Sequence, residues 1–188
     1  MKAVATAIAD VQLLEPRVFD DSRGFFFESY NERVLAGFGI LGPFVQDNQS
    51  FSHKNVVRGL HYQIEQPQGK LIRCLSGEIF DVAVDIRRSS PTFGRHLAVV
   101  LSAENWKQLY VPVGFAHGYC TLDPDSEVIY KVTAYYDPES ERGVAWDDPD
   151  IGIAWPLDPK SAVLTQRDRA LPRLAELPDF FPYSQFPD

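Results

Sequence analysis

Cysteine, positive charge and long apolar runs are all scarce in this 188-residue chain. Cys74 and Cys120 each lie in an apolar run and follow no metal-binding spacing, which favours buried free thiols in a reducing cytoplasm over a disulfide framework. A formal net charge of −8 argues against a nucleic-acid or anionic-membrane partner, although a few local arginines suffice to bind a small anion. No apolar run approaches the roughly 20 residues of a membrane-spanning helix. The short N-terminal apolar stretch carries a lysine, ends at Asp10 and does not predict a signal peptide.

The dominant pattern in the sequence is an alternation of apolar and polar residues. Val82 and Val84 fall on one face of residues 78–86, whereas Asp81 and Asp85 fall on the other, as expected for a β-strand. Hydrophobic residues make up 45% of the chain and aromatic residues 13%, which is enough for one globular domain with a sizeable core. Many short strands between turn residues predict an all-β barrel or sandwich. The expected strands span residues 11–19, 24–30, 45–51, 55–62, 70–75, 78–86, 96–101, 108–111, 116–122 and 127–136.

Short helices are expected beside these strands. Asn31 is a suitable N-cap for a helix over residues 32–35, and a second short helix is expected near 173–177. The region after Pro138 is rich in proline and aspartate and predicts a lid and tail instead of a second domain. The expected organisation is one domain over 1–188, with a barrel core at about 20–136 and a lid and C-terminal tail at about 137–188.

Residues 58–63 read Arg-Gly-Leu-His-Tyr-Gln and resemble a cupin metal motif without its ligands. That motif runs H-x-H, then Glu, then six residues and Gly, and Gln63 and Lys70 occupy the second His and the Glu positions. The second half of the cupin pattern, P-x-G-x-x-H, occurs at 112–117. A lysine cation stands where a metal would need an anionic ligand. We therefore expect no metal, and we expect proton transfer and anion binding.

Basic side chains lie close to His61 in the sequence. A lone histidine in a strand is more often a structural residue bonded to backbone, but Arg58 and Lys70 are nearby and such residues are rarely buried unpaired. Arginine suits phosphate forks and lysine provides a point charge, so the group predicts an anion-lined cavity. For Tyr130, periodicity alone favours a core tyrosine whose hydroxyl finds a partner. The alternative is a proton donor pointing into the barrel.

Three other sequence features are weaker evidence of function when each is taken alone. His117 lacks partner ligands at Gln63 and Lys70, so a polar contact to substrate, or support for Lys70, is more plausible than metal binding. Asp168 lies in a charged stretch whose simplest interpretation is a solvated surface. Three consecutive phenylalanines at 25–27 follow a turn, and one face of that strand needs a cover, which predicts a subunit interface or a ligand lid.

Taken together, these short motifs resemble the dTDP-4-dehydrorhamnose 3,5-epimerase family. They run in the family's order from about residue 20 to 170. Arg-Gly-Leu-His alone is a weak signal, whereas the ordered set is specific. The matching segments are Asp21-x-Arg23-Gly24-x-Phe26-x-Glu28, Gln46-Asp47-Asn48, Arg58-Gly59-Leu60-His61-x-Gln63, Lys70, Phe80-Asp81-Val82-Ala83-Val84-Asp85, Ser90-Pro91-Thr92-Phe93-Gly94, Pro112-x-Gly114-x-Ala116-His117-Gly118, Tyr130 and Arg167-Asp168.

The resemblance implies an all-β fold, a cupin-like jelly-roll β-barrel with short flanking helices. It also implies epimerisation of dTDP-4-dehydro-6-deoxy-D-glucose at C3 and C5, giving dTDP-4-dehydro-L-rhamnose for dTDP-L-rhamnose biosynthesis. Both carbons flank the C4 ketone, so inversion through an enolate needs a base on one face and an acid on the other. Family precedent makes His61 the base, oriented by Asp168, and Tyr130 the acid. Lys70 would stabilise the C4 oxyanion in place of a metal, so no cofactor is expected.

Substrate contacts and an assembly follow from the same resemblance. The implied contacts are Arg23, Phe26, Glu28, Gln46, Asn48, Arg58, His117, Glu141 and Arg167. A homodimer is implied, although the sequence leaves open whether Arg23, Phe26 and Glu28 act within one chain or across the dimer. The family often has lysine just before the aspartate. Arg167 keeps the charge there but changes the geometry of the contact.

Other functions share parts of the pattern. A mono-epimerase acting at C3 or C5 only, in another deoxysugar pathway, has the same residue set, and no feature separates the two. A sugar 3,4-ketoisomerase arranges its histidine and tyrosine differently, so His61, Lys70 and Tyr130 argue against it. Gln63 and Lys70 disfavour a metal-dependent cupin oxygenase. A non-catalytic nucleotide-sugar-binding barrel has no use for His61, Asp168 and Tyr130 together. The final sugar, the glycan that receives it and the strictness for thymidine are left open.

Overall fold

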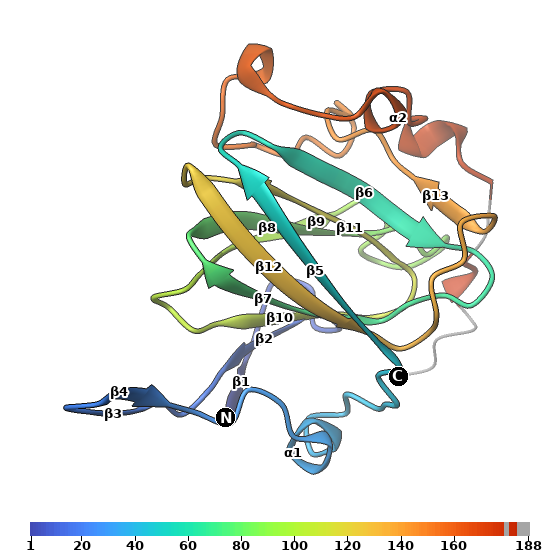
Figure 1. Cartoon of the computed structure of the whole chain (residues 1–188). Helices are drawn as coiled ribbons and strands as arrows, with labels where there is room; N and C mark the ends of the chain where they lie inside the picture. The colour runs from blue at the N-terminus through green and yellow to red at the C-terminus, as the bar shows by residue number, and fades with distance from the viewer. Residues whose placement is uncertain (179–180, 184–188) are drawn as a thin grey trace.

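Two antiparallel β-sheets form a jelly-roll barrel in the computed structural model, which describes residues 1–178 and 181–183 (Figure 1). One sheet has six strands in the order β1-β2-β10-β7-β12-β5, and the other has five in the order β13-β6-β11-β8-β9. The strands are β1 (Lys2–Val4), β2 (Gln12–Glu15), β5 (Gln46–His53), β6 (Val57–Gln63), β7 (Lys70–Ser76), β8 (Glu78–Asp85), β9 (His96–Ser102), β10 (Gln108–Val111), β11 (Phe115–Thr121), β12 (Asp125–Val132) and β13 (Glu141–Gly143).

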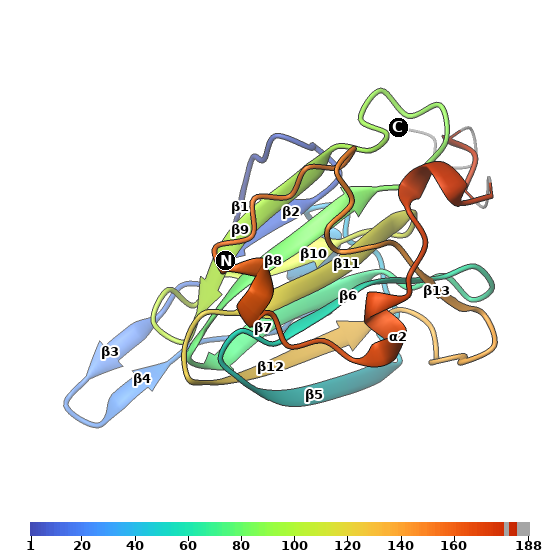
Figure 2. The same ribbon diagram turned by 90° about the horizontal axis from the view of Figure 1, so that it is seen from above.

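A separate hairpin and several short helices lie around the barrel. Strands β3 (Phe19–Asp21) and β4 (Gly24–Phe26) pair with each other in a separate two-stranded sheet and project away from the two larger sheets in both views (Figures 1 and 2). The helices are α1 (Glu32–Ala36), the 3-10 helix η1 (Pro159–Ser161), α2 (Gln166–Arg169) and the 3-10 helix η2 (Leu174–Glu176). Helix α2 lies beside β6, at one edge of the five-stranded sheet (Figure 1).

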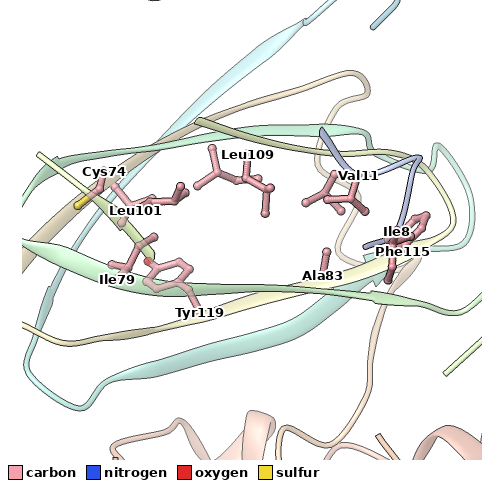
Figure 3. Packing of buried hydrophobic residues seen from close by; sticks show 12 residues of the cluster. Ile8, Val11, Cys74, Ile79, Ala83, Leu101, Leu109, Phe115 and Tyr119 are labelled. Atoms are coloured by element: carbon pink, nitrogen blue, oxygen red, sulfur yellow. The ribbon is translucent and has the colours of Figure 1, made fainter. Parts of the chain in front are cut away.

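The main hydrophobic core lies between the two sheets (Figure 3). Alternate residues of β8 enter different cores, because successive side chains of a strand point to opposite faces. Ile79 and Ala83 pack inside the barrel, whereas Val82 and Val84 pack under the C-terminal segment that carries Val144. Both faces of the five-stranded sheet are therefore covered, and Asp81, two residues from each of Ile79 and Ala83, shares the interior face.

The sequence predicted most of these elements. The strand at 108–111 is confirmed, and Asn31 caps α1 by accepting hydrogen bonds from two backbone amides, as expected. The strand expected over 11–19 is wrong as one element, because it divides into β2 and β3. The helix expected near 173–177 is a single 3-10 turn, and the stretch containing Asp168 forms α2, which was not predicted.

Strand pairing also extends beyond the expected limits of the barrel. Strands β1, β2 and β13 lie outside residues 20–136, and β13 pairs with β6 directly beside the cavity described below. The all-β barrel with short flanking helices is confirmed. In the part of the chain that the structure describes, no helix is long and apolar enough to cross a membrane.

Candidate active site

Two glycines set the close spacing of β6 and β11. Gly59 has φ +112°, and a Cβ placed there would lie 2.7 Å from both the Gly118 Cα and the His117 carbonyl oxygen. A Cβ on Gly118 would lie 2.5 Å from the Arg58 carbonyl oxygen. Glycine is the one residue that permits such an approach at both positions. The resulting register places His117 directly opposite His61.

His61 and Asp168 form a histidine–carboxylate pair. The His61 Nε2 lies 2.8 Å from Oδ1 of Asp168, which is supplied by α2 and is only 5% exposed. Burial alone would raise the pKa of Asp168, but the hydrogen bond and charge of His61, followed by Thr165 and Arg167, hold it below its usual value. The carboxylate therefore stays ionised and orients the ring. The His61 Nδ1 is then the nitrogen available for proton transfer.

Glu141 lies on the other side of the imidazole. Its Oε1 is 3.8 Å from the His61 Nδ1, and its Oε2 is 2.6 Å from the Arg167 Nη1. The Tyr136 hydroxyl also donates to Oε2, at 2.9 Å. Glu141 thereby connects β13 with the residue that precedes Asp168 in α2. The hydrogen bond to Glu141 raises the pKa of Arg167 and outweighs the opposing effect of burial, so the guanidinium stays protonated.

Lys70 is a buried cation inside the barrel. It is 7% exposed, and its Nζ donates to the His61 carbonyl oxygen at 3.3 Å. Burial lowers the pKa of Lys70 to about 8, although the charges of Glu141 and Asp81 act in the opposite direction. Lys70 is thus mostly protonated at neutral pH. A poorly solvated ammonium interacts more strongly with a nearby oxyanion than an ammonium in water does.

Tyr130 comes from β12, in the sheet opposite to the one that carries His61. Burial, followed by neighbouring Tyr119, raises the pKa of Tyr130, so the phenol stays protonated at neutral pH and is able to donate. The Tyr119 hydroxyl lies 2.7 Å from the Ser50 Oγ, which links the two sheets. The Arg58 Nε donates to the Ser52 Oγ at 3.0 Å on the same strand as Ser50.

His117 belongs to a second histidine–carboxylate pair. Its Nε2 lies 2.9 and 3.0 Å from the two carboxylate oxygens of Asp81, and both residues are buried. The alternating sequence predicts a strand face for Asp81 but indicates no role for it. The available signal was an aspartate between apolar residues of a central strand, because a buried carboxylate needs a partner.

One cavity of about 270 Å³ brings most of the predicted residues together. Ser50, Tyr119 and Thr165 line it too and were not predicted. For Thr165 the signal was the sequence T-x-x-D, a helix-capping pattern. The lining residues are Ser50, Arg58, His61, Lys70, His117, Gly118, Tyr119, Tyr130, Thr165, Arg167 and Asp168.

A smaller cavity of about 90 Å³ adjoins the first and shares Lys70 and Tyr130 with it. It contains three more of the predicted binding residues, which are Gln46, Asn48 and Glu141. Tyr62, Gln63, Gln68 and Tyr136 also line it and were not assigned to substrate binding. Its lining residues are Gln46, Asn48, Tyr62, Gln63, Gln68, Lys70, Tyr130, Tyr136 and Glu141. Polar and charged side chains make up most of the lining of both cavities.

Three predicted residues do not line either cavity. Arg23 and Phe26 lie on or next to the projecting hairpin, where Phe26 is 72% exposed and Arg23 pairs with Asp21. Glu28 follows the hairpin and accepts a hydrogen bond from Asn31 at 2.9 Å. A single chain therefore does not bring these three side chains to the site.

The donor set around His61 differs from that of a metal cupin. Gln63 uses its amide to bond the Gln66 and Tyr135 carbonyl oxygens at 2.9 and 3.1 Å. Within residues 1–178 and 181–183, no three or more His, Cys, Asp or Glu are grouped as a metal ion would require. The expectation that the reaction needs no metal stays a prediction.

Comparison with known proteins identifies the family. The family model described as dTDP-4-dehydrorhamnose 3,5-epimerase matches residues 5–176. The chain belongs to this epimerase family. The Pseudomonas aeruginosa dTDP-4-dehydrorhamnose 3,5-epimerase is 52% identical over 97% of this chain and 100% of the relative. The Salmonella typhimurium enzyme is 54% identical over 93% and 96%. The Legionella pneumophila dTDP-6-deoxy-D-glucose-3,5-epimerase, solved with dTDP-4-keto-L-rhamnose, is 45% identical with TM-score 0.93, covering 96% and 97%.

These similarities confirm the family resemblance, the cupin-like jelly roll and the classification as an isomerase. The ChmJ 3'-monoepimerase from Streptomyces bikiniensis, solved with dTDP-quinovose, is 35% identical with TM-score 0.85, covering 91% of this chain and 87% of ChmJ. The fold is thus common to single and double epimerases. The higher identity to enzymes named 3,5-epimerases favours the double reaction for this epimerase.

Proposed function

We propose that this epimerase inverts C3 and C5 of dTDP-4-dehydro-6-deoxy-D-glucose, giving dTDP-4-dehydro-L-rhamnose for dTDP-L-rhamnose biosynthesis. The C4 ketone acidifies the C–H bonds on both neighbouring carbons, because the carbanion is stabilised as an enolate. Each inversion then removes a proton from one face and delivers a proton to the other. One observation carries the proposal: His61 and Tyr130 line one cavity from opposite sheets.

His61 acts as the base in this reaction. Asp168 accepts from Nε2 at 2.8 Å, so the lone pair is on Nδ1 and takes the substrate proton. The ionised carboxylate then stabilises the imidazolium that forms. Tyr130 donates its phenolic proton to the opposite face of the enolate, which completes the inversion. Solvent exchange resets both groups before the second carbon reacts.

Lys70 stabilises the negative charge on the C4 oxygen. Its buried ammonium lies beside His61, where the enolate forms. Removal of a donor to such an oxyanion typically costs about 3–4 kcal/mol of transition-state stabilisation. Because a protein cation supplies this interaction, we propose that the reaction uses no cofactor.

The nucleotide part of the substrate occupies the rest of the two adjoining cavities. Arg58 and Arg167 supply cations for the diphosphate, and His117 lies beside the sugar. Gln46, Asn48 and Glu141 offer polar contacts in the smaller cavity. Arg23, Phe26 and Glu28 complete the site of the other subunit in a homodimer. This arrangement is supported by the lining of the two cavities, which does not include these three residues of the same chain.

We further propose that residues 1–188 form one domain and that the epimerase works in the cytoplasm. Pairing of β13 with β6 supports the single domain, because it joins the C-terminal part to the barrel. Cys74 and Cys120 are both buried free thiols, which supports a reducing compartment.

Proton NMR of the substrate in D₂O with purified epimerase tests the reaction. We expect deuterium at both C3 and C5, together with conversion to the L-lyxo configuration. Exchange at one carbon only would make the protein a mono-epimerase of another deoxysugar pathway. A folded protein that exchanges neither position would not be an epimerase of this substrate, and a binding function would replace the proposal.

A further inference from the structure

Helix α2 begins with a capping pattern in which one of the two usual hydrogen bonds is made and the other is replaced. Thr165 precedes Gln166–Arg169 as N-cap, and Asp168 stands at the third helical position, which gives the sequence T-x-x-D. In a complete capping box, the acidic residue reaches back to the N-cap amide. Here the Asp168 carboxylate bonds His61 instead. The other half remains, since the Thr165 Oγ1 accepts from the Asp168 backbone N–H at 3.1 Å.

A four-residue helix has little stability of its own, because nucleation fixes several residues for few hydrogen bonds. The position of Asp168 therefore depends on local hydrogen bonds. The Thr165 hydroxyl holds the Asp168 amide, and the Thr165 carbonyl oxygen accepts from the Arg169 N–H at 3.1 Å. The Arg169 guanidinium donates to the Ala162 carbonyl oxygen at 2.8 Å. Of these three hydrogen bonds, the one from the Asp168 N–H to the Thr165 hydroxyl is the one that involves Asp168 itself.

We propose that Thr165 is a positioning residue of the epimerase: its hydroxyl fixes the Asp168 backbone so that the carboxylate stays on the His61 Nε2. This inference rests on the proposed role of His61 as base. Thr165 acts through Asp168 and takes no part in proton transfer.

Two further observations support a role beyond ordinary capping. Thr165 is exposed to solvent and lines the main cavity, so its side chain has no packing function to explain it. After the interactions with His61, Thr165 is a further contributor to the lowered pKa of Asp168. A matched cap in the same C-terminal segment is Asp158, which accepts from the Lys160 N–H at 2.9 Å and is not among the lining residues of the main cavity.

The test compares Thr165→Val, Thr165→Ser and Asp158→Ala with the wild-type epimerase. We expect kcat to fall about tenfold in Thr165→Val, the size of a lost N-cap, while KM changes less than about twofold. Thr165→Ser restores the hydroxyl and should recover kcat. Asp158→Ala, which removes a cap without touching the base, should match the wild type.

A spectroscopic measurement separates positioning from general destabilisation. The proton on the His61 Nε2 gives a downfield NMR signal, assigned by its loss in His61→Gln, and it should weaken in Thr165→Val and return in Thr165→Ser. Wild-type kcat with an unchanged signal in Thr165→Val would overturn the inference. So would a rise in KM at constant kcat, or an equal loss in Asp158→Ala. Full activity of Asp168→Asn would instead contradict the proposed function itself.

Discussion

At the residue scale, the site depends on charged and polar groups that are buried with specific partners. Asp168 holds His61, Asp81 holds His117, and Lys70 donates to a backbone oxygen. Each partner offsets the cost of taking a polar group out of water. For residues that line the cavity, such as His61, removal of one partner should therefore change activity more than stability.

His61→Ala and Tyr130→Phe should each lower kcat about 10²–10⁴-fold, the usual contribution of a general acid or base. Both side chains line the cavity, so thermal unfolding and dTDP binding should stay close to the wild type. Deuterium incorporation at C3 and C5 measures the two inversions separately. Full exchange at both carbons in Tyr130→Phe would show that another group is the acid.

The alkaline side of the pH–rate profile should report Lys70. Its pKa is lowered by burial to about 8, so the ammonium is present below that pH and is lost as the pH rises through it. We expect kcat to fall above pH 8 for this reason. Lys70→Gln should lower kcat about 10²–10³-fold and remove this alkaline decline. A decline that persists in Lys70→Gln would assign it to a different group.

At the scale of elements, the spacing of strands matters more than any one contact. Strands β6 and β11 approach closely at Gly59 and Gly118, and this approach aligns His61 with His117. Helix α2 then adds Asp168 from a segment more than one hundred residues later in the chain, since the separation from His61 is 107 positions. The dyad thus requires the C-terminal segment to be docked on the sheet.

Gly118→Ala should disturb this spacing. The new Cβ would lie 2.5 Å from the Arg58 carbonyl oxygen and 2.9 Å from the Leu60 Cδ2, so the strands must separate. We expect a loss of about 1–3 kcal/mol in the free energy of unfolding, as for other overpacked sites, measured by urea titration. Gly37→Ala is the control, because Gly37 is in the αR region at the end of α1. Equal losses in both variants would rule out strand spacing as the cause.

At the scale of the whole molecule, the single chain leaves a projecting hairpin with exposed aromatic residues. Phe25 and Phe26 are 56% and 72% exposed, and Phe25 and Phe27 contact Trp106 at the base of the hairpin. Exposed apolar surface of this kind is typical of an interface. The chain carries a net charge of −8, yet its cavity is lined by Arg58, Lys70 and Arg167. Local placement of cations, not total charge, suits the site to an anionic substrate.

Subunit mixing tests whether the hairpin completes the site of a partner. A His61→Ala chain carries a normal hairpin, and an Arg23→Ala/Phe26→Ala chain carries a normal base. If the hairpin acts across a two-fold dimer, mixing these two weakly active proteins should restore about a quarter of wild-type activity. The restored site combines the base of one chain with the hairpin of the other. No recovery, in a mixture that mass spectrometry shows to contain heterodimers, would place the hairpin in the site of its own chain.

The amino-acid sequence was enough to predict most of the strands, the family and many of the residues that line the two cavities. Alternation with a period of two predicts strands, and motifs such as Arg-Gly-Leu-His contain residue types that suit the chemistry. Sequence could not reveal the Asp81–His117 pair or the role of α2. Asp81 alternates with apolar residues on a strand buried on both faces, so periodicity does not say which face is the interior.

The folded molecule shows how side chains from distant segments meet. His61 and Asp168 are 107 positions apart, and the distance of 2.8 Å between them results from packing of the C-terminal segment on β6. A strand pattern depends on neighbouring residues in the sequence, whereas a contact between distant segments depends on the path of the whole chain. For the same reason, the projecting position of Arg23 and Phe26 became visible only in the folded molecule.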